Sequence, residues 1–193
     1  MLHPAARIPA PAAPATPCPV RTPRQPARAR LPGLDHFNTA PEAAATATVL
    51  TCCNSRRWAH RIVAHRPYPD VDALLAAADE ASYDLSAADL DEALTGERSF
   101  GLPPTAPASA HTALRAAHAA YEASFGHAFV ICLDGFHPDE HPDQVLAGIR
   151  SRLGNDPDEE RVTAADELRR LARARLGRTV ARSTGNEPIG PRQ

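Results

Sequence analysis

Apolar residues recur every three or four positions through most of the chain between residues 35 and 181, the spacing that places them on one face of an α-helix. The pattern predicts helices over about 39–53, 55–66, from 70, over 86–94, 110–125, around 145–153 and from 155 onward. Residues 95–109 hold glycines and prolines that break helix, so they predict a loop. Residues 129–133 are a short apolar run that reads as a buried strand or an extended segment.

Polar residues mark where several of these helices begin. Thr39, with Glu42 three positions later, is expected to form a capping box at the start of the first helix. Ser55, Asp70 and Ser86 stand before the next three apolar patterns, where a side-chain oxygen can accept from the free N–H groups of a first turn. The local sequence therefore predicts where four helices start.

The faces predicted to be buried are rich in alanine and leucine, and the chain has a single tryptophan, Trp58. Because Trp58 and Ile62 are one helical turn apart, we expect Trp58 to be a core anchor. The stripe expected on the last helix comprises Val162, Ala165, Leu168, Ala172 and Leu176. Several such faces joined by short connections predict an all-α domain, a compact helical bundle of six to eight helices.

The two ends of the chain differ in composition from this domain. Residues 1–34 contain nine of the 20 prolines, several arginines and no acidic residue, so they predict a disordered tail. Residues 182–193 are polar and predict a flexible C-terminal tail. The predicted organisation is therefore a Pro/Arg-rich tail over 1–34, a helical domain over 35–181 and a second tail over 182–193.

Charge and cysteine content exclude some classes of partner. The net charge of -2 gives no field that would attract a polyanion, so no nucleic-acid partner is expected. No apolar run approaches the roughly 20 residues that span a bilayer, so no membrane partner is expected either. Cys18, Cys52, Cys53 and Cys132 form neither a CxxC pair nor a disulfide framework, which indicates a reducing compartment and a cytoplasmic location. Cys52 and Cys53 are expected to pack in the core as small apolar side chains.

Two patterns suggest chemistry but favour a structural explanation. Residues 137–141 match the H-x-x-E-H arrangement of some zinc peptidases. Pro142 disfavours helical geometry at His141 and no third ligand follows, so we expect a solvated loop without metal. The last helix carries acidic residues early and arginines late, an order that suits the helix dipole and predicts a solvated helix. One of its arginines could nevertheless face a substrate. These arginines are Arg169, Arg170, Arg173, Arg175 and Arg178.

Short segments in three regions carry a family resemblance. The first region holds Phe37-Asn38, Cys52-Cys53-x-Ser55-x-x-Trp58 and Arg66-Pro67-Tyr68. The second holds Tyr121-Glu122-x-x-Phe125-Gly126 and Phe129-Val130-Ile131. The third holds Arg152-Leu153-x-Asn155, Glu159-Glu160, Ala165-x-Glu167-Leu168-Arg169 and Arg175-Leu176. In this order and at these spacings, the segments resemble those of the OHCU decarboxylases (2-oxo-4-hydroxy-4-carboxy-5-ureidoimidazoline decarboxylases) of urate breakdown.

The resemblance implies an all-helical homodimer that acts on a small ureidoimidazoline and uses neither a metal nor an organic cofactor. The family reaction removes one carboxylate and delivers (S)-allantoin. Loss of CO2 leaves a carbanion that can delocalise into the neighbouring imine of the ring. The protein then has to supply a pocket for the ring and carboxylate, together with stereospecific protonation.

The sequence departs from the family at the loop after the fourth expected helix. The family has a His-Pro-Arg-Ile-Gly segment there, whose histidine is its main catalytic residue. If Gly101 matches the motif glycine, Glu97 stands at the position of that histidine. The family's following Glu-Gln-Ala-Gly segment, which carries a second catalytic carboxylate, has no clear counterpart.

This departure leaves two classes of function open. In an active but divergent decarboxylase, Glu97 could donate the proton if burial raised its pKa, or His111 or His118 could replace the imidazole. Arg98 or Arg175 would then hold the substrate carboxylate, and Arg175 matches the arginine of the family's terminal Leu-Arg-Leu. The alternative is a non-catalytic homologue, a binding or regulatory protein on the same scaffold. A cavity lined by Glu97, Arg98, His111 and Arg175 would favour an enzyme, whereas a cavity filled by Phe100 and prolines would favour the non-catalytic homologue.

Overall fold

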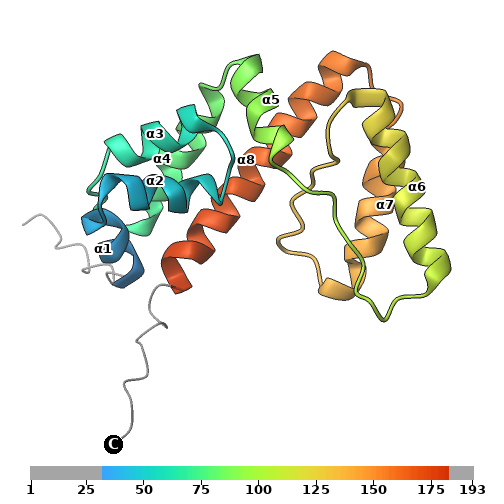
Figure 1. Ribbon diagram of the computed structural model, residues 1–193, viewed down its shortest axis with the longest axis horizontal. Helices are drawn as coiled ribbons and strands as arrows, with labels where there is room; N and C mark the ends of the chain where they lie inside the picture. Colours follow the sequence, from blue (N-terminus) through green and yellow to red (C-terminus); the bar gives the residue numbers. More distant parts are fainter. Residues whose placement is uncertain (1–31, 183–193) are drawn as a thin grey trace, which may run out of the picture.

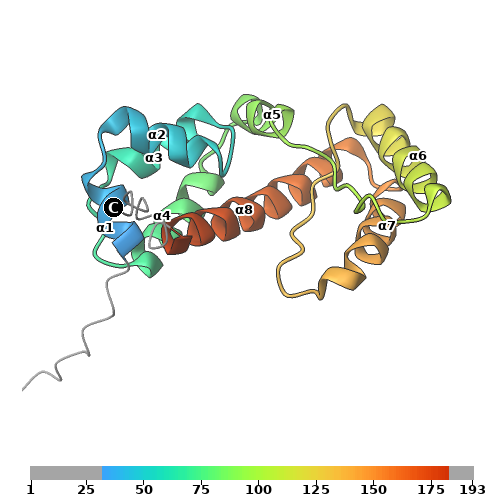
Figure 2. The same cartoon turned by 60° about the horizontal axis from the view of Figure 1, so that its bottom comes forward.

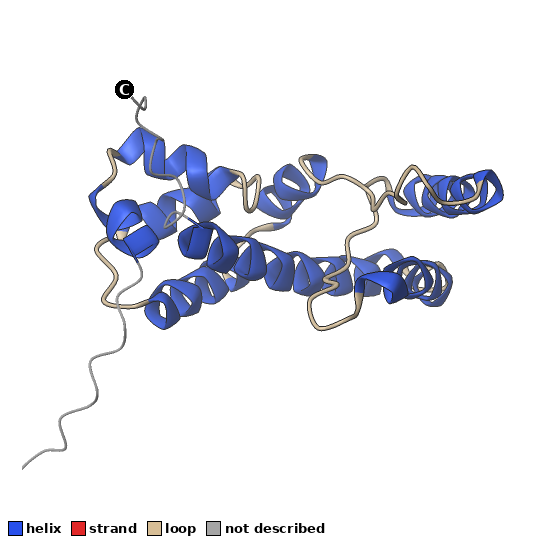
Figure 3. Ribbon diagram, turned by 90° about the horizontal axis from the view of Figure 1, so that it is seen from below, coloured by secondary structure: helices blue, strands red, loops and turns tan. Residues whose placement is uncertain are grey.

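The computed structural model describes residues 32–182, so most of the tails predicted over 1–34 and 182–193 lie outside the described part. The described residues form α1 (Pro32–Thr39), α2 (Glu42–Leu50), α3 (Arg56–Ala64), α4 (Val71–Tyr83), α5 (Ala87–Thr95), α6 (Ala108–Phe125), the 3-10 helix η1 (Pro138–Glu140), α7 (His141–Arg152) and α8 (Pro157–Arg182). No strand occurs among them, and residues 129–133 are extended without strand pairing (Figure 3). The prediction of an all-α bundle of six to eight helices is confirmed.

The long helix α8 joins two groups of helices. Helices α1 to α4 lie along its C-terminal half, where α1 and α4 pack directly against it, and α6 and α7 pair with each other at its N-terminal end (Figures 1 and 2). Two clusters of buried apolar side chains match this arrangement, one between α1–α5 and α8 and one around α6, α7 and residues 129–133. No helix within residues 32–182 is long and apolar enough to cross a bilayer.

Most of the predicted capping residues are confirmed. The Ser55 side chain accepts from the backbone N–H of Trp58, and Asp70 Oδ1 accepts from Ala73 N at 2.8 Å. Ser86 forms a capping box with Asp89 at the start of α5. These caps satisfy N–H groups that have no partner inside the helix, which is why a short local sequence is enough to predict them.

The predicted start of the first helix at Thr39 is wrong. Thr39 ends α1, and its hydroxyl donates to the carbonyl of Asp35 at 2.9 Å. Helix α2 begins at Glu42 after Pro41, without a side-chain cap, and ends at Leu50 instead of near residue 53. The helical domain also begins earlier than residue 35, because α1 includes Leu34, which is 1% exposed and belongs to the core beside α8.

The core contains most of the side chains that the apolar pattern predicted, but at the start of α8 Ala164 is buried and the predicted Ala165 is only partly buried. Trp58 is fully buried, and Cys52 and Cys53 are buried beside it in the same cluster, as expected. Val162 was predicted to be buried but is 72% exposed, whereas Glu160 is fully buried. The stripe on α8 is thus displaced from the predicted one, because a buried carboxylate occupies a position that hydropathy alone assigns to the surface.

Glu160 is stabilised by a network of polar side chains from α6, α7 and the turn before α8. Arg152 Nε donates to its Oε1 at 2.9 Å and Asn155 Nδ2 to its Oε2 at 3.0 Å, while the Tyr121 hydroxyl donates to Oε1. Arg152 also donates to the Tyr121 hydroxyl and, at 2.8 Å, to the carbonyl of Val130. The network joins α6, α7 and α8 to the extended segment, and its members come from the second and third regions that carry the family resemblance.

Candidate functional site

A cavity of about 340 Å³ opens beside the loop that follows α5. Its lining comes from the loop, from the extended segment after α6 and from residues 171–178 of α8. Figure 1 shows how these three segments lie. The side chains that line it are Glu97, Arg98, Phe100, Phe129, Val130, Ile131, Leu133, Asp134, His141, Leu171, Arg175 and Arg178. The cavity therefore combines an apolar lining with three guanidinium groups, two carboxylates and one imidazole.

Two polar contacts, one buried and one partly buried, fix the extended segment that lines the cavity. Arg152 of α7 donates to the carbonyl of Val130, and the backbone N–H of Cys132 donates to Glu167 Oε2 of α8 at 2.7 Å. An extended chain without strand partners needs such acceptors and donors, because an unpaired buried backbone group costs free energy. Both helices thus determine where the wall of the cavity lies.

Glu97 and Arg175 form a direct, two-point ion pair. Arg175 donates from its two terminal nitrogens to the two Glu97 oxygens at 2.7 and 2.8 Å, and one of those nitrogens also donates to the carbonyl of Cys52. The Glu97 side chain is only 5% exposed. The hydrogen bonds from Arg175 to Glu97 raise the pKa of Arg175 despite its partial burial. A carboxylate that accepts on both oxygens from a guanidinium has no proton to donate, so this geometry opposes Glu97 as a general acid.

Arg98 and Arg178 supply the accessible positive charge of the cavity. Arg178 pairs with Asp134 at 2.8 Å, and both side chains are about half exposed. Arg98 is exposed and makes no hydrogen bond or ion pair with another residue of 32–182. A guanidinium without a protein partner can bind a carboxylate at two points, so Arg98 is the arginine most available to an anionic ligand.

Neither of the histidines predicted as substitutes lines this cavity. His111 lies half-buried near the start of α6. His118 is buried behind the loop, where Nε2 contacts the carbonyl of Phe100 at 3.1 Å and Nδ1 has no partner within the described residues. Burial lowers the pKa of His118, although the contact with Phe100 partly opposes this shift. His118 therefore favours the neutral form and supports the loop from behind.

His141 does line the cavity, although the sequence pattern suggested it only as a zinc ligand. It is the first residue of α7 and is half-buried. Its ring meets Phe100 edge to face with centroids 6.1 Å apart, and its Nε2 lies 3.3 Å from the carbonyl of Phe136. His137 makes separate local contacts in η1. Within residues 32–182, no group of three or more potential ligands is arranged to hold a metal ion. The solvated loop predicted for residues 137–141 is instead η1 and the start of α7.

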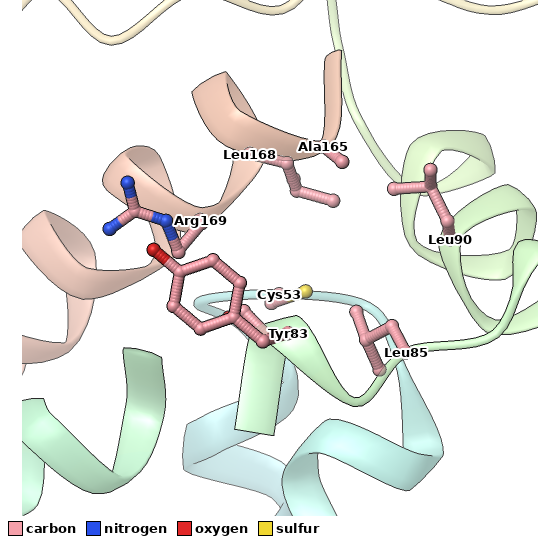
Figure 4. A pocket seen from close by; sticks show the side chains of 8 residues that line it. Cys53, Tyr83, Leu85, Leu90, Ala165, Leu168 and Arg169 are labelled. Atoms are coloured by element: carbon pink, nitrogen blue, oxygen red, sulfur yellow. The ribbon is translucent and has the colours of Figure 1, made fainter. Parts of the chain in front are cut away.

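A smaller cavity of about 170 Å³ lies between α4, α5 and α8 (Figure 4). Leu85, Leu90 and Leu168 form its walls, with Cys53 at its base and Tyr83 and Arg169 at its rim. Burial raises the pKa of Cys53 to about 12, so its thiol is protonated near neutral pH and is a poor nucleophile. None of the predicted site residues lines this cavity, whereas Glu97, Arg98 and Arg175 line the cavity beside the loop after α5, which is therefore the candidate site.

The fold and the site together define the class of protein: it is an all-α domain with a small, positively charged cavity beside the loop that follows its fifth helix. A model of the OHCU decarboxylase family matches residues 38–101 and 95–177 of the chain. This match covers more than half of the sequence, and the chain belongs to the OHCU decarboxylase family. The two matched stretches meet at residues 95–101, the segment that contains Glu97.

Two solved structures share the fold. One is an OHCU decarboxylase in the presence of (S)-allantoin, with a TM-score of 0.60 and 21% identity over 72% of this chain and 97% of that chain. The other is an (S)-allantoin synthase, with a TM-score of 0.58 and 17% identity over 76% of this chain and 53% of that chain. The chain thus spans about half the length of the synthase, and at these identities the likeness shows the fold alone. No curated protein sequence matches the chain significantly.

Proposed function

We propose that this protein decarboxylates an OHCU-type ureidoimidazoline to (S)-allantoin in the cavity beside the loop after α5. The observation that carries the proposal is the presence of an unpaired guanidinium, Arg98, on an open cavity that also holds an apolar lining and an imidazole. Membership of the OHCU decarboxylase family supports the same reaction. An apolar cavity with a few convergent polar groups is the usual form of a small-molecule site.

Arg98 is proposed to bind the substrate carboxylates, with Arg178 beside it. Arg175 matches the family's arginine, but both of its terminal nitrogens already donate to Glu97. We therefore assign Glu97 the role of holding Arg175 in place, and not the role of proton donor. Loss of CO2 needs no cofactor, because the electron pair of the broken C–C bond can delocalise into the ring imine. The cavity then has to orient the ring and protonate one face of it.

The test is a coupled assay in which urate oxidase and hydroxyisourate hydrolase generate fresh substrate from urate. The protein should accelerate allantoin formation, and circular dichroism should show an excess of the S enantiomer. Uncatalysed protonation in water attacks both faces of a planar intermediate equally and gives a racemate. A rate and an optical signal equal to those without the protein would exclude decarboxylation of this substrate.

Arg98→Gln tests the binding role. A lost charge-assisted hydrogen bond is worth about 1.5–3 kcal/mol, so KM should rise about tenfold or more. Arg115→Gln is the matched control, because Arg115 is exposed on α6 and does not line the cavity. Equal KM values for the two variants would show that Arg98 does not bind the substrate.

Replacing Glu97 tests the role of the loop. Glu97→His adds an imidazole to the cavity wall at the position of the family's catalytic histidine, so the rate of allantoin formation should rise. Glu97→Gln removes the negative charge without adding a proton donor, and its rate should stay below that of Glu97→His. If neither variant nor the parent protein is active or binds allantoin, the decarboxylase function fails.

One observation favours the alternative, a non-catalytic binding protein on the same scaffold. The ion pair with Glu97 occupies the arginine that the family resemblance assigns to substrate binding. Saturable binding of allantoin by calorimetry, without turnover in the coupled assay, would support this alternative.

Two further properties remain predictions: the cytoplasmic location indicated by the cysteines and the homodimer implied by the resemblance. Light scattering after gel filtration tests the homodimer.

A further inference from the structure

We infer that His141 is the catalytic proton donor of this site and replaces the imidazole that the loop after α5 lacks. The inference rests on the proposed decarboxylase function. It assigns the stereospecific protonation to a residue at the start of α7, about 40 positions after Glu97 in the sequence.

The positions and contacts of the other ionisable side chains within residues 32–182 oppose them as the proton donor. Glu97 accepts from Arg175 on both oxygens and is almost fully buried. His118 is buried behind Phe100, and His111 does not line the cavity. Among the described histidines, only His141 lines it. The remaining ionisable groups on its walls are Arg98, Arg175 and Arg178, whose protons are held too tightly for acid catalysis, and Asp134, which is paired with Arg178.

The surroundings of His141 hold the ring beside the loop and fix its protonation pattern. A carbonyl oxygen can only accept, so the contact between Nε2 and the Phe136 carbonyl requires the proton to be on Nε2. Nδ1 is then the nitrogen that gains and loses a proton. The edge-to-face contact with Phe100 ties the ring to the segment that contains Glu97 and Arg98.

The step balances without any further reactant. The bond between the ring carbon and the carboxylate breaks, CO2 leaves, and the electron pair stays on the ring carbon and its conjugated imine. The Nδ1–H of the His141 imidazolium gives its proton to that carbon, and the neutral imidazole takes a proton from water before the next turnover. Protonation from one wall of the cavity produces one enantiomer.

The experiment compares His141→Gln with the parent protein in the coupled assay. The glutamine amide can still donate to the Phe136 carbonyl but cannot deliver a proton near neutral pH. A general acid contributes about 10²–10⁴-fold, so kcat should fall at least about 100-fold and the excess of (S)-allantoin should disappear. KM should change little, because Arg98 remains. The control is His111→Gln, which should keep the parent rate and enantiomeric excess.

The outcomes distinguish a failure of the His141 assignment from a failure of the proposed decarboxylase function. If the parent protein is active and His141→Gln keeps its rate and enantiomeric excess, His141 is not the donor, while the decarboxylase function stands. If the parent protein is inactive, the proposed function fails and the inference fails with it. If His141→Gln melts several degrees lower, His141→Ala is measured with added imidazole. Recovery of rate by imidazole supports the assignment, and no recovery overturns it.

Discussion

Replacement of Arg152 by methionine should destabilise the protein strongly, because it leaves Glu160 charged, buried and short of donors. The Glu160 side chain is 1% exposed, and Arg152 is its nearest cation. The same guanidinium donates to Tyr121 and Val130 and lies 4.6 Å above the ring of Phe129. Removing one partner of a buried ion pair costs about 3–5 kcal/mol. For a chain of this size the melting temperature changes by roughly 2–4 °C per kcal/mol, so we expect a fall of about 6–20 °C.

The measurement is urea unfolding followed by circular dichroism, with Arg150→Met as the matched control. Arg150 is exposed on the same helix, so its replacement should stay within about 0.5 kcal/mol of the parent protein. A loss for Arg152→Met no larger than that of Arg150→Met would refute the idea that Arg152 compensates the buried charge.

The pH dependence of the unfolding free energy gives a second test of the same cluster. On acidification the parent protein should lose stability, whereas Arg152→Met should gain stability relative to it. Burial by itself would raise the pKa of Glu160, but hydrogen bonds from Arg152 and Tyr121 outweigh it and lower this pKa below its ordinary value. In the parent protein Glu160 therefore adds stability above its unfolded pKa, and this stability is lost as pH falls through the folded pKa. In Arg152→Met burial should dominate and raise the pKa, so this variant should gain stability, relative to the parent, as Glu160 is protonated. The difference in unfolding free energy between the two proteins should therefore shrink on acidification.

Three further predictions follow from the described contacts. Trp58→Ala should cost about 3–5 kcal/mol in urea unfolding, because the buried indole also donates to Ala78 and Ser82; a normally stable variant would contradict its role as a core anchor. The lowered pKa of His118 means that the unfolded chain is protonated first, so unfolding free energy should decline as pH falls below about 6.5, and the decline should be smaller in His118→Phe. An unchanged slope in that variant would assign the decline to other groups. Deletion of residues 1–31 should leave the melting temperature nearly unchanged. Deletion of residues 1–34 should lower it, because this deletion also removes the buried Leu34. Equal melting temperatures for the two deletion variants would show that Leu34 adds no stability.

Local signals in the sequence were sufficient for most of the fold. Ser55, Asp70 and Ser86 cap helices as predicted, and Gly126 ends α6 with a φ of 77° that favours glycine. These signals succeed because a cap or a C-terminal glycine acts on groups within four residues. Trp58 was also predicted correctly, since helical periodicity reports which face of a helix is buried.

Tertiary contacts decided where local signals competed. The motif that begins at Thr39 resembles a helix start, yet α1 runs up to it because Leu34 and Phe37 gain burial in the core beside α8. Glu160 looks like a surface residue in the sequence. It is buried because Tyr121, which is 39 positions away on α6, and Arg152, at the end of the preceding helix α7, both donate to its carboxylate, and Arg152 compensates its charge.

The sequence and its family resemblance predicted Glu97, Arg98 and Arg175 as site residues, and all three line the cavity. What the sequence alone could not give is that Glu97 and Arg175 neutralise each other and that His141 completes the wall. Helix periodicity reports a face and a cap reports an end, but neither carries information about which distant side chains meet. That pairing depends on how α8, the loop after α5 and the start of α7 pack together, so only the three-dimensional arrangement of these elements determines it.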